Sequence, residues 1–323
     1  MLYSKSTYPL IATALFFATG FIFGEDPQIS SWYTTASGQY ARIYETLDDQ
    51  NSKNAVSVWS RGQGNQSLPT YAGVHEVSYS NDWVYIRSSN LASYVMGPWY
   101  LDTAKSNIFP NYPANRAVLY RFPRSPSPAI DNTLTGLGAI GYFVDGVAMF
   151  DNRDAFSYSN SNASDARPNT SFRGDGIWNR DAYVNESVTF DAGNAHQAGS
   201  NYHYHANPPG LRFLLGDHVD YDSTRNTYSE NVSDPSHSPI IGWVRDGYPI
   251  YGPYGYSDPN DASSSVRRML SGYQKRDGSN GSTNLNLTGR TSLPAWAVTA
   301  QSIGPGLATG QEGPDVGIAN YPL

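Results

Sequence analysis

Short runs of β-branched and aromatic residues alternate with turn-forming residues along most of the chain. The clearest runs are 55–59 (AVSVW), 83–87 (WVYIR) and 117–122 (AVLYRF), which are bounded by Asn, Gly, Ser or Pro. Runs of this length and composition are typical of strands. The pattern predicts a mostly β fold, with antiparallel sheets in a sandwich or barrel-like arrangement. One short helix is expected over 266–270, after a Pro-Asn-Asp turn.

Two segments of the chain resemble each other, 140–150 (IGYFVDGVAMF) and 241–251 (IGWVRDGYPIY). Both keep Ile-Gly, Asp-Gly and a final Met or Ile followed by an aromatic residue at the same spacing. Asp-Gly between apolar strands is a strong hairpin signal, because both turn residues must adopt positive φ. We therefore expect two pseudo-repeated β-hairpins that pack together. Independent convergence on the same hairpin chemistry is the alternative.

The N-terminus has the features of an export signal. Lys5 precedes an apolar run over 10–17, and the small residues of 18–20 suit a signal peptidase. The apolar stretch is short for a transmembrane helix, which needs about 20 residues. We predict a signal peptide over 1–24 and a secreted or periplasmic protein, with an uncleaved N-terminal anchor as the alternative.

A stiff Pro-containing connection, 124–128 (RSPSP), suggests an internal boundary. On this basis the mature chain divides into a β-rich region over 25–128 and a second domain over 129–323. The same residues are also compatible with one continuous domain.

Composition excludes several functional classes. The chain has 21 Lys and Arg against 28 Asp and Glu, so it lacks the surplus positive charge of a general nucleic-acid binder. The same acidity argues against docking on anionic membranes, so no membrane contact is expected beyond the signal peptide. There is no cysteine, which excludes disulfides, thiolate metal sites and a cysteine nucleophile. Any metal must be held by His, Asp, Glu, Tyr or backbone oxygen.

Five of the six histidines fall between 196 and 237, and two of them lie in the tetrapeptide 202–205 (YHYH). In a strand, His203 and His205 would share one face while Tyr202 and Tyr204 occupy the other. Side chains two residues apart are about 7 Å apart, so both imidazoles can converge on one ion. For the two tyrosines we favour a packed aromatic face over a role as ligands.

Two further histidines complete the candidate metal site, which consists of His203, His205, His237 and His196. Imidazole ligands suit copper or zinc, with iron as a further possibility. Solvated or core-bonded imidazoles are the alternative. We expect His218 to lie in a solvated acidic loop, with a hard-cation site formed by its neighbours Asp217, Asp220 and Asp222 as the alternative. We expect His75 to be a surface or core residue.

A carboxylate near the histidines would serve as a further ligand or as a general base. The candidates are Glu186, Asp191 and Asp217, and the sequence does not choose among them. The chain contains no Gly-x-Ser-x-Gly elbow, phosphate loop, dinucleotide fingerprint or His-Glu-x-x-His motif.

Several blocks together resemble the YHYH-domain family of exported proteins. They are 202–205 (YHYH), 207–211 (NPPGL), 237–242 (HSPIIG) and 246–256 (DGYPIYGPYGY), and the resemblance extends from about 136 to 273. It implies that His196, His203, His205 and His237 are the recurring histidines of the family. It also implies a longer C-terminus than this chain has, so we expect a C-terminally truncated domain. The family is named after its motif and not after a reaction.

The sequence therefore predicts an exported metal-binding protein with a His-rich centre that holds one transition-metal ion. If three histidines leave an open position, the centre could activate water with zinc, or dioxygen with copper or iron. In that case it would be a metal-dependent enzyme of unknown substrate. The alternative is a cell-surface adhesion or glycan-binding β-module whose histidines are structural.

Overall fold

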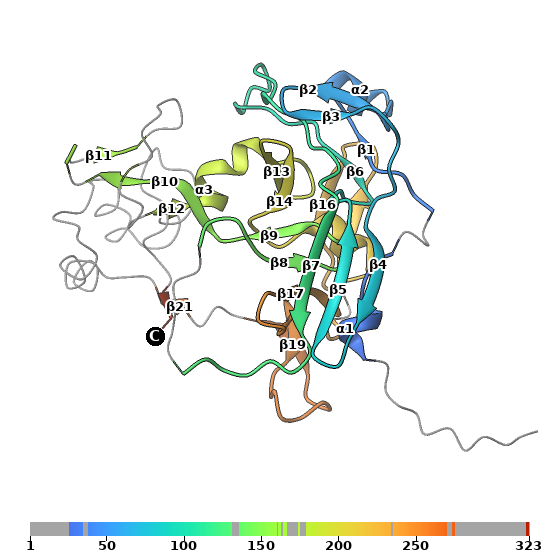
Figure 1. Ribbon diagram of the computed structural model, residues 1–323, viewed down its shortest axis with the longest axis vertical. Coiled ribbons are helices and arrows are strands. Elements are labelled where there is room, and N and C mark those ends of the chain that lie inside the picture. Colours follow the sequence, from blue (N-terminus) through green and yellow to red (C-terminus); the bar gives the residue numbers. More distant parts are fainter. Residues whose placement is uncertain are drawn as a thin grey trace, which may run out of the picture.

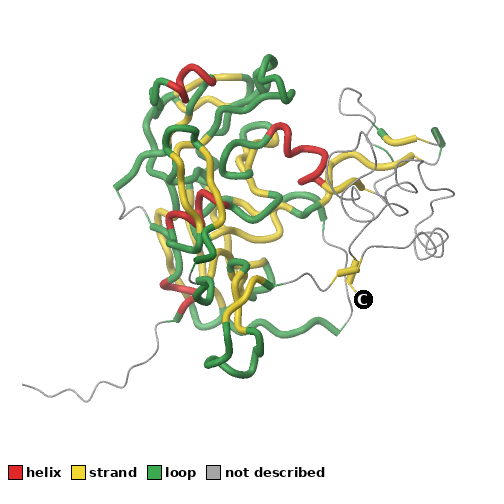
Figure 2. The backbone as a smooth tube through the Cα atoms, turned by 180° about the vertical axis from the view of Figure 1, so that it is seen from behind, coloured by secondary structure: helices red, strands yellow, loops and turns green. Residues whose placement is uncertain are grey.

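The computed structural model describes residues 26–34, 38–130, 136–159, 161–162, 164–166, 174, 179–233, 235–269, 273–274 and 321–322. The signal peptide expected over 1–24 lies outside these residues. Within them, no helix is both long enough and apolar enough to span a bilayer. The described chain is mostly β, as predicted, and its few helices are short (Figure 2).

The largest sheet has six strands in the order β13-β14-β9-β8-β17-β18. Their bounds are Ala195–Ala198 (β13), Asn201–Tyr204 (β14), Ala148–Phe150 (β9), Ala139–Phe143 (β8), Ile240–Val244 (β17) and Pro249–Tyr251 (β18). All neighbours are antiparallel except β14 and β9, which run parallel. The YHYH tetrapeptide therefore begins on an inner strand of this sheet and runs just past its end.

A three-stranded antiparallel sheet lies beside it, formed by β4 (Val74–Tyr79), β5 (Trp83–Ser88) and β7 (Val118–Pro123) (Figure 1). The two sheets pack through aromatic side chains, since the rings of Tyr120 and Tyr142 are 4.6 Å apart. This face-to-face packing gives the core a sandwich-like character. The described strands form no closed barrel.

The remaining strands form small sheets around this core. They are β1 (Arg42–Ile43) with β6 (Val95–Met96), β2 (Trp59–Arg61) with β3 (Gly64–Gln66), β10 (Arg153–Ser159) with β11 (Ser164–Asp165) and β12 (Asn179–Asp181), β15 (Val219–Asp222) with β16 (Thr227–Glu230), β19 (Tyr254–Tyr256) with β20 (Val266–Arg268), and β21 (Tyr273–Gln274) with β22 (Tyr321–Pro322). The helices are α1 (Pro27–Ser30), α2 (Leu47–Asn51), α3 (Ala182–Glu186), the 3₁₀ turn η2 (Ser187–Thr189) and α4 (Pro209–Leu214).

Two of the three predicted runs match strands closely, since 83–87 falls in β5 and 117–122 in β7. The run 55–59 forms only a bridge at Val56 and the first residue of β2. The helix expected over 266–270 is wrong, because 266–268 form β20. Antiparallel pairing with β19 satisfies the backbone there in place of helical hydrogen bonds.

The two similar segments form adjacent hairpins, β8–β9 and β17–β18, as predicted. Tyr142 on β8 pairs with Trp243 on β17, its equivalent in the second segment. Two equivalent backbone hydrogen bonds flank this pair, from Val144 N to Ile241 O at 2.9 Å and from Arg245 N to Ile140 O at 2.8 Å. The hairpins are thus related by an approximate two-fold axis at the Tyr142–Trp243 pair.

The two Asp-Gly turns adopt the same conformation in different surroundings. Gly146 and Gly247 have φ of 75° and 89°, values that favour glycine. The expectation that both turn residues adopt positive φ is wrong, because Asp145 and Asp246 do not. A Cβ at Gly146 would lie 2.3 Å from Ser88 Oγ. Asp145 is fully buried, whereas Asp246 is exposed. Only the first turn therefore points into the core.

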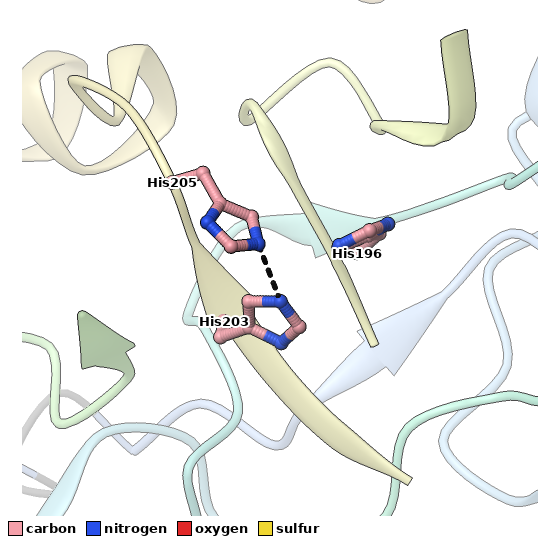
Figure 3. Close-up of side chains that lie close together, drawn as sticks. All are labelled: His196, His203 and His205. Carbon is pink, nitrogen blue, oxygen red and sulfur yellow. Dashed lines mark hydrogen bonds between the residues drawn. The ribbon is translucent and has the colours of Figure 1, made fainter. Parts of the chain in front are cut away.

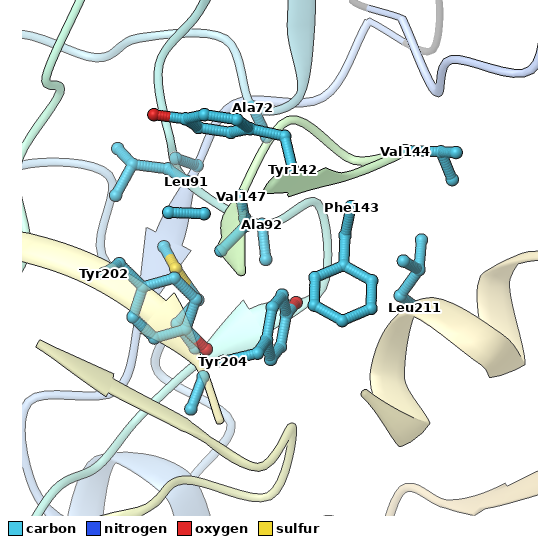
Figure 4. Close-up of a cluster of buried hydrophobic side chains, with 14 of the residues drawn as sticks. Ala72, Leu91, Ala92, Tyr142, Phe143, Val144, Val147, Tyr202, Tyr204 and Leu211 are labelled. Atoms are coloured by element: carbon cyan, nitrogen blue, oxygen red, sulfur yellow. The ribbon is translucent and has the colours of Figure 1, made fainter. Parts of the chain in front are cut away.

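The core takes side chains from both sides of residue 128. Leu91 and Ala92 are fully buried in the same cluster as Tyr202 and Tyr204 of the motif (Figure 4). Trp99 is also fully buried, and its ring lies 6.0 Å from that of Tyr202. Tertiary contacts of this kind hold the N-terminal β-rich region against the six-stranded sheet.

Asn90 fixes the position of β14 against β9. Its buried side chain accepts a hydrogen bond from Ala148 N at 2.8 Å and donates one to Tyr202 O at 2.7 Å. The residue has φ of 63°, a left-handed conformation that Asn tolerates better than most residues. The amide therefore bridges the only two strands of the described six-stranded sheet that run parallel.

Candidate metal centre

Two adjacent strands bring three of the predicted histidines together. His196 on β13 lies directly opposite His203 on β14, and His205 follows the last residue of β14. Alternation along β14 turns His203 away from the tyrosine face, as predicted. Figure 3 shows the three rings gathered around one space.

The ligand nitrogens of the three histidines all lie within 4.8 Å of one another. Nε2 of His203 and Nε2 of His205 are 3.0 Å apart. Two ligands about 2.1 Å from a zinc-like ion would be separated by about 3.0 to 3.4 Å. The spacing therefore suits two ligands of one metal ion.

Backbone carbonyls determine which nitrogen of two rings carries the proton. Nδ1 of His203 lies 2.8 Å from Asn201 O, and Nδ1 of His205 lies 2.8 Å from Asp151 O. A carbonyl oxygen can only accept, so each Nδ1–H donates. In the neutral rings both Nε2 atoms then carry a lone pair that faces the other histidines.

His196 is oriented in the same way by a hydroxyl group. Thr189 Oγ1 donates to Glu186 O at 2.6 Å, so it accepts from Nδ1 of His196 at 2.7 Å. Nε2 of His196 is therefore also unprotonated when the ring is neutral. Hydrogen bonds that fix a ring in this way are typical of metal-binding histidines.

Burial keeps the three rings neutral. It lowers the pKa of His196 to about 3, and it lowers the pKa of His203 well below the usual value of 6.5. The pKa of His205 is also lowered, first by burial, although the Glu186 carboxylate opposes this. Three lone pairs consequently point at each other with no proton between them, an arrangement that a bound cation stabilises.

A carboxylate lies beside two of the three histidines. Glu186, the last residue of α3, places Oε2 2.9 Å from His196 Nε2 and 3.6 Å from His205 Nε2. Because His196 is neutral, the shorter contact is not an ion pair. The Glu186 side chain is 21% exposed, against 8% for His196 and 5% for His205. Glu186 therefore lies on the more accessible side of the centre.

Aromatic side chains enclose the rings. Phe150 stacks on His203 with ring centroids 3.8 Å apart, and Phe190 lies edge-on to His196 at 4.9 Å. Phe109 also packs against His196, with ring centroids 5.9 Å apart. This apolar shell excludes water and limits rotation of the imidazoles.

Comparison with known proteins identifies the family. The family model described as YHYH protein matches residues 119–303, more than half of the chain. The chain belongs to the YHYH protein family. No curated protein and no solved structure matches it.

The fourth predicted ligand of this YHYH protein lies outside the three-histidine group. His237 is exposed, and its ring packs on Tyr256 at 4.8 Å and Tyr251 at 5.3 Å. Its Nδ1 lies 2.8 Å from Ser238 O. Strand geometry unites His196, His203 and His205, whereas His237 precedes β17 in a separate segment.

The other histidines have local partners. His218 is not solvated as expected, since its side chain is only 7% exposed and packs on Tyr254 at 4.4 Å. It binds Asp217 Oδ1 through Nδ1 and accepts from Ser236 N through Nε2, both at 2.9 Å. His75 is exposed, and its Nε2 lies 2.8 Å from Tyr71 O.

The structure also separates the three carboxylate candidates. Glu186 joins the histidines, Asp217 binds Arg212 and His218, and Asp191 lies on the tyrosine face of β14. Thr189 and the carbonyl of Asp151 orient the rings but were missed by the sequence analysis. No sequence signal marks either, because each acts through a contact made only in the folded chain.

The tyrosines of the motif belong to a fully buried hydrogen-bonded chain. Tyr94 Oη lies 2.8 Å from both Tyr202 Oη and Tyr204 Oη. Tyr202 then donates to Asp191 Oδ2 at 2.6 Å, and Tyr204 Oη lies 3.0 Å from Asp145 Oδ2. The packed aromatic face predicted for these tyrosines is therefore also a polar network.

The network needs one proton more than its tyrosines supply. Its four oxygen–oxygen contacts need four protons, but three phenols supply only three. One additional proton on a carboxyl group would complete the chain. Burial raises the pKa of Asp145 and of Asp191 to about 6. Asp191 also accepts three backbone N–H groups, so we assign the extra proton to Asp145.

Proposed function

We propose that this YHYH protein is exported and binds one transition-metal ion through Nε2 of His196, His203 and His205. The Glu186 carboxylate serves as the fourth donor. One observation carries the proposal: all three Nδ1 atoms are engaged with oxygen partners, so the three Nε2 lone pairs are left to face one another beside the Glu186 carboxylate.

The donor set narrows the choice of metal. Three imidazoles and one carboxylate, without sulfur, suit zinc or copper(II), and also iron(II). Magnesium and calcium are disfavoured because they prefer oxygen ligands throughout. Such an ion supplies Lewis-acid chemistry when an external molecule reaches it. Glu186 is the most exposed of the four donors, so a small molecule would approach from its side.

Elemental analysis tests the metal centre directly. The protein is purified without an affinity His-tag and measured beside the double variant His203→Ala/His205→Ala. We expect about one equivalent of metal in the parent and none in the double variant. His75→Ala and His237→Ala, which remove exposed histidines, should retain the metal. A parent that stays empty after reconstitution with zinc, copper and iron contradicts the proposal.

Spectroscopy of the cobalt(II)-substituted protein tests the accessible position. Added azide should change the visible ligand-field bands if an external molecule can reach the ion, and it should leave them unchanged if the site is closed. Export is tested separately, because the proposal requires the mature N-terminus to begin near residue 25. Mass spectrometry of the protein from its natural source would reveal this.

A further inference from the structure

A cavity of about 280 Å³ is lined by residues close in sequence to the candidate metal centre. Ala206, which follows His205, forms part of one wall. Tyr183 forms part of another and lies three residues before Glu186 on α3, on the same side of the helix. The polar lining residues are Asn194, Asn207, Arg212, Glu230 and Arg268.

The two arginines that line the cavity are neutralised by nearby carboxylates of the protein. Arg212 is almost completely buried and donates through Nε to Asp217 Oδ2 at 2.7 Å and through Nη2 to Glu230 Oε2 at 3.1 Å. Arg268 lies 3.5 Å from Glu230 Oε1. Two guanidinium groups thus face two carboxylates, so the cavity gives no electrostatic preference for an anion or a cation.

The lining still offers hydrogen bonds. The side chains of Arg268 and Glu230 are 55% and 39% exposed, so this donor and this acceptor can each form further hydrogen bonds with a ligand. Asn207 Oδ1 is buried and has no hydrogen-bond partner among the described residues. Because this oxygen is closed to solvent, the exposed Arg268–Glu230 pair is what offers hydrogen bonds to a ligand.

Tyr183 adds a flat apolar surface to this polar lining. It is 44% exposed, and its ring lies 6.1 Å from Phe190, which also contacts His196. A pyranose ring presents an apolar C–H face that stacks on an aromatic ring, and its hydroxyls both donate and accept. A purely apolar ligand would leave the Arg268–Glu230 pair unsolvated, which is unfavourable.

We propose that this cavity binds a neutral saccharide unit. The sugar ring stacks on Tyr183, and neighbouring hydroxyls bridge Glu230 and Arg268. The cavity lies just below the usual range of ligand pockets, about 300 to 1,000 Å³, so it suits a small ligand such as one sugar ring. A reaction of this sugar rests on the proposed metal function, whereas its binding does not.

Saturation-transfer NMR on the full chain tests the proposal. The probes are glucose, N-acetylglucosamine and their β-1,4-linked dimers, with glucuronate as a charged comparison. We expect transfer to the ring protons of at least one neutral probe and weaker transfer to glucuronate. Tyr183→Ala and Arg268→Ala should each weaken binding about tenfold, the loss of roughly one contact.

Matched variants control for indirect effects. Tyr183→Phe keeps the ring and should bind nearly as well as the parent. Arg267→Ala removes the neighbouring exposed arginine, which does not line the cavity, and should bind equally well. The proposal is overturned if no neutral probe shows transfer, or if Tyr183→Ala and Arg268→Ala bind as tightly as Arg267→Ala.

The same samples distinguish this proposal from the metal proposal. Sugar binding by a protein that never takes up metal would contradict the metal function and leave the cavity assignment intact. Metal uptake without sugar binding would contradict the cavity assignment alone.

Discussion

Asp145→Asn should remove part of the pH dependence of folding. In the parent, the chain from Asp145 through Tyr204, Tyr94 and Tyr202 to Asp191 needs one proton beyond those of the phenols. An amide at position 145 can donate permanently to Tyr204 Oη while its oxygen accepts from Val147 N, as Asp145 Oδ1 does now. Every link then has its proton at any pH.

The expected magnitude follows from the pKa of Asp145, which burial raises from 3.8 to about 6. Because the folded-state pKa is the higher one, the stabilisation by the proton is complete below pH 3.8 and is lost as the pH rises through about 6. A difference of this size corresponds to about 3 kcal/mol in the free energy of unfolding. Asp191 is unchanged in the variant, so only the contribution of Asp145 is counted.

Urea unfolding between pH 4.5 and 8 measures the effect. His196 titrates in the opposite sense, since its lowered pKa of about 3 makes stability fall as the pH drops below 6.5. This contribution is common to the parent and its variants. The informative quantity is therefore the difference between their free energies of unfolding at each pH. Between pH 4.5 and 8 that difference should change by about 2 kcal/mol in favour of Asp145→Asn, because about 1 kcal/mol of the stabilisation is already lost at pH 4.5.

Asp246→Asn is the matched control for this experiment. Asp246 occupies the equivalent position in the second hairpin but is exposed, so its variant should follow the parent at every pH. If the free energies of unfolding of the parent and of Asp145→Asn change equally with pH, the proton count is refuted. A parent that gains stability relative to Asp145→Asn with rising pH would also refute it.

Three further predictions concern the metal centre and the first hairpin. Glu186→Gln should bind zinc about 10- to 100-fold more weakly in a competition with a chromophoric chelator; unchanged affinity would remove Glu186 from the ligand set. Zinc at a hundred times its Kd should raise the free energy of unfolding by about 2.7 kcal/mol, and chelator should reverse this. His203→Ala should abolish the gain. Gly146→Ala should destabilise the protein by about 1 to 3 kcal/mol more than Gly38→Ala in thermal unfolding, because both positions have positive φ but only the first meets Ser88. Equal losses would show that the close contact is relieved without cost.

The sequence was most informative where a local pattern determines geometry. Alternation in the tetrapeptide correctly placed His203 on one face of a strand and Tyr202 and Tyr204 on the other. The Asp-Gly repeat correctly gave two hairpins. Both results follow from rules that involve only neighbouring residues.

Predictions that depend on long-range contacts were less complete. Closeness in sequence suggested His237 as a ligand, but its segment packs against Tyr251 and Tyr256. Glu186 was one of three equal candidates until the position of α3 beside β13 distinguished it. The pairing of β19 with β20 likewise overrode the expected helix. None of these contacts leaves a periodic signal in the sequence.

The hydrogen bonds of Asn90 disfavour a misfolded form in which β14 pairs with β9 in a shifted register. Because the motif repeats every two residues, a slip of β14 by two positions along β9 would keep each tyrosine and histidine on its proper face. The burial of hydrophobic side chains therefore hardly distinguishes the native register from the slipped one. The slip would separate Asn90 from Tyr202 O and leave buried polar groups unpaired, at a cost of about 1 to 3 kcal/mol each. Asn90 thus favours the strand register that brings the three histidines together, although it is not one of the metal-binding residues.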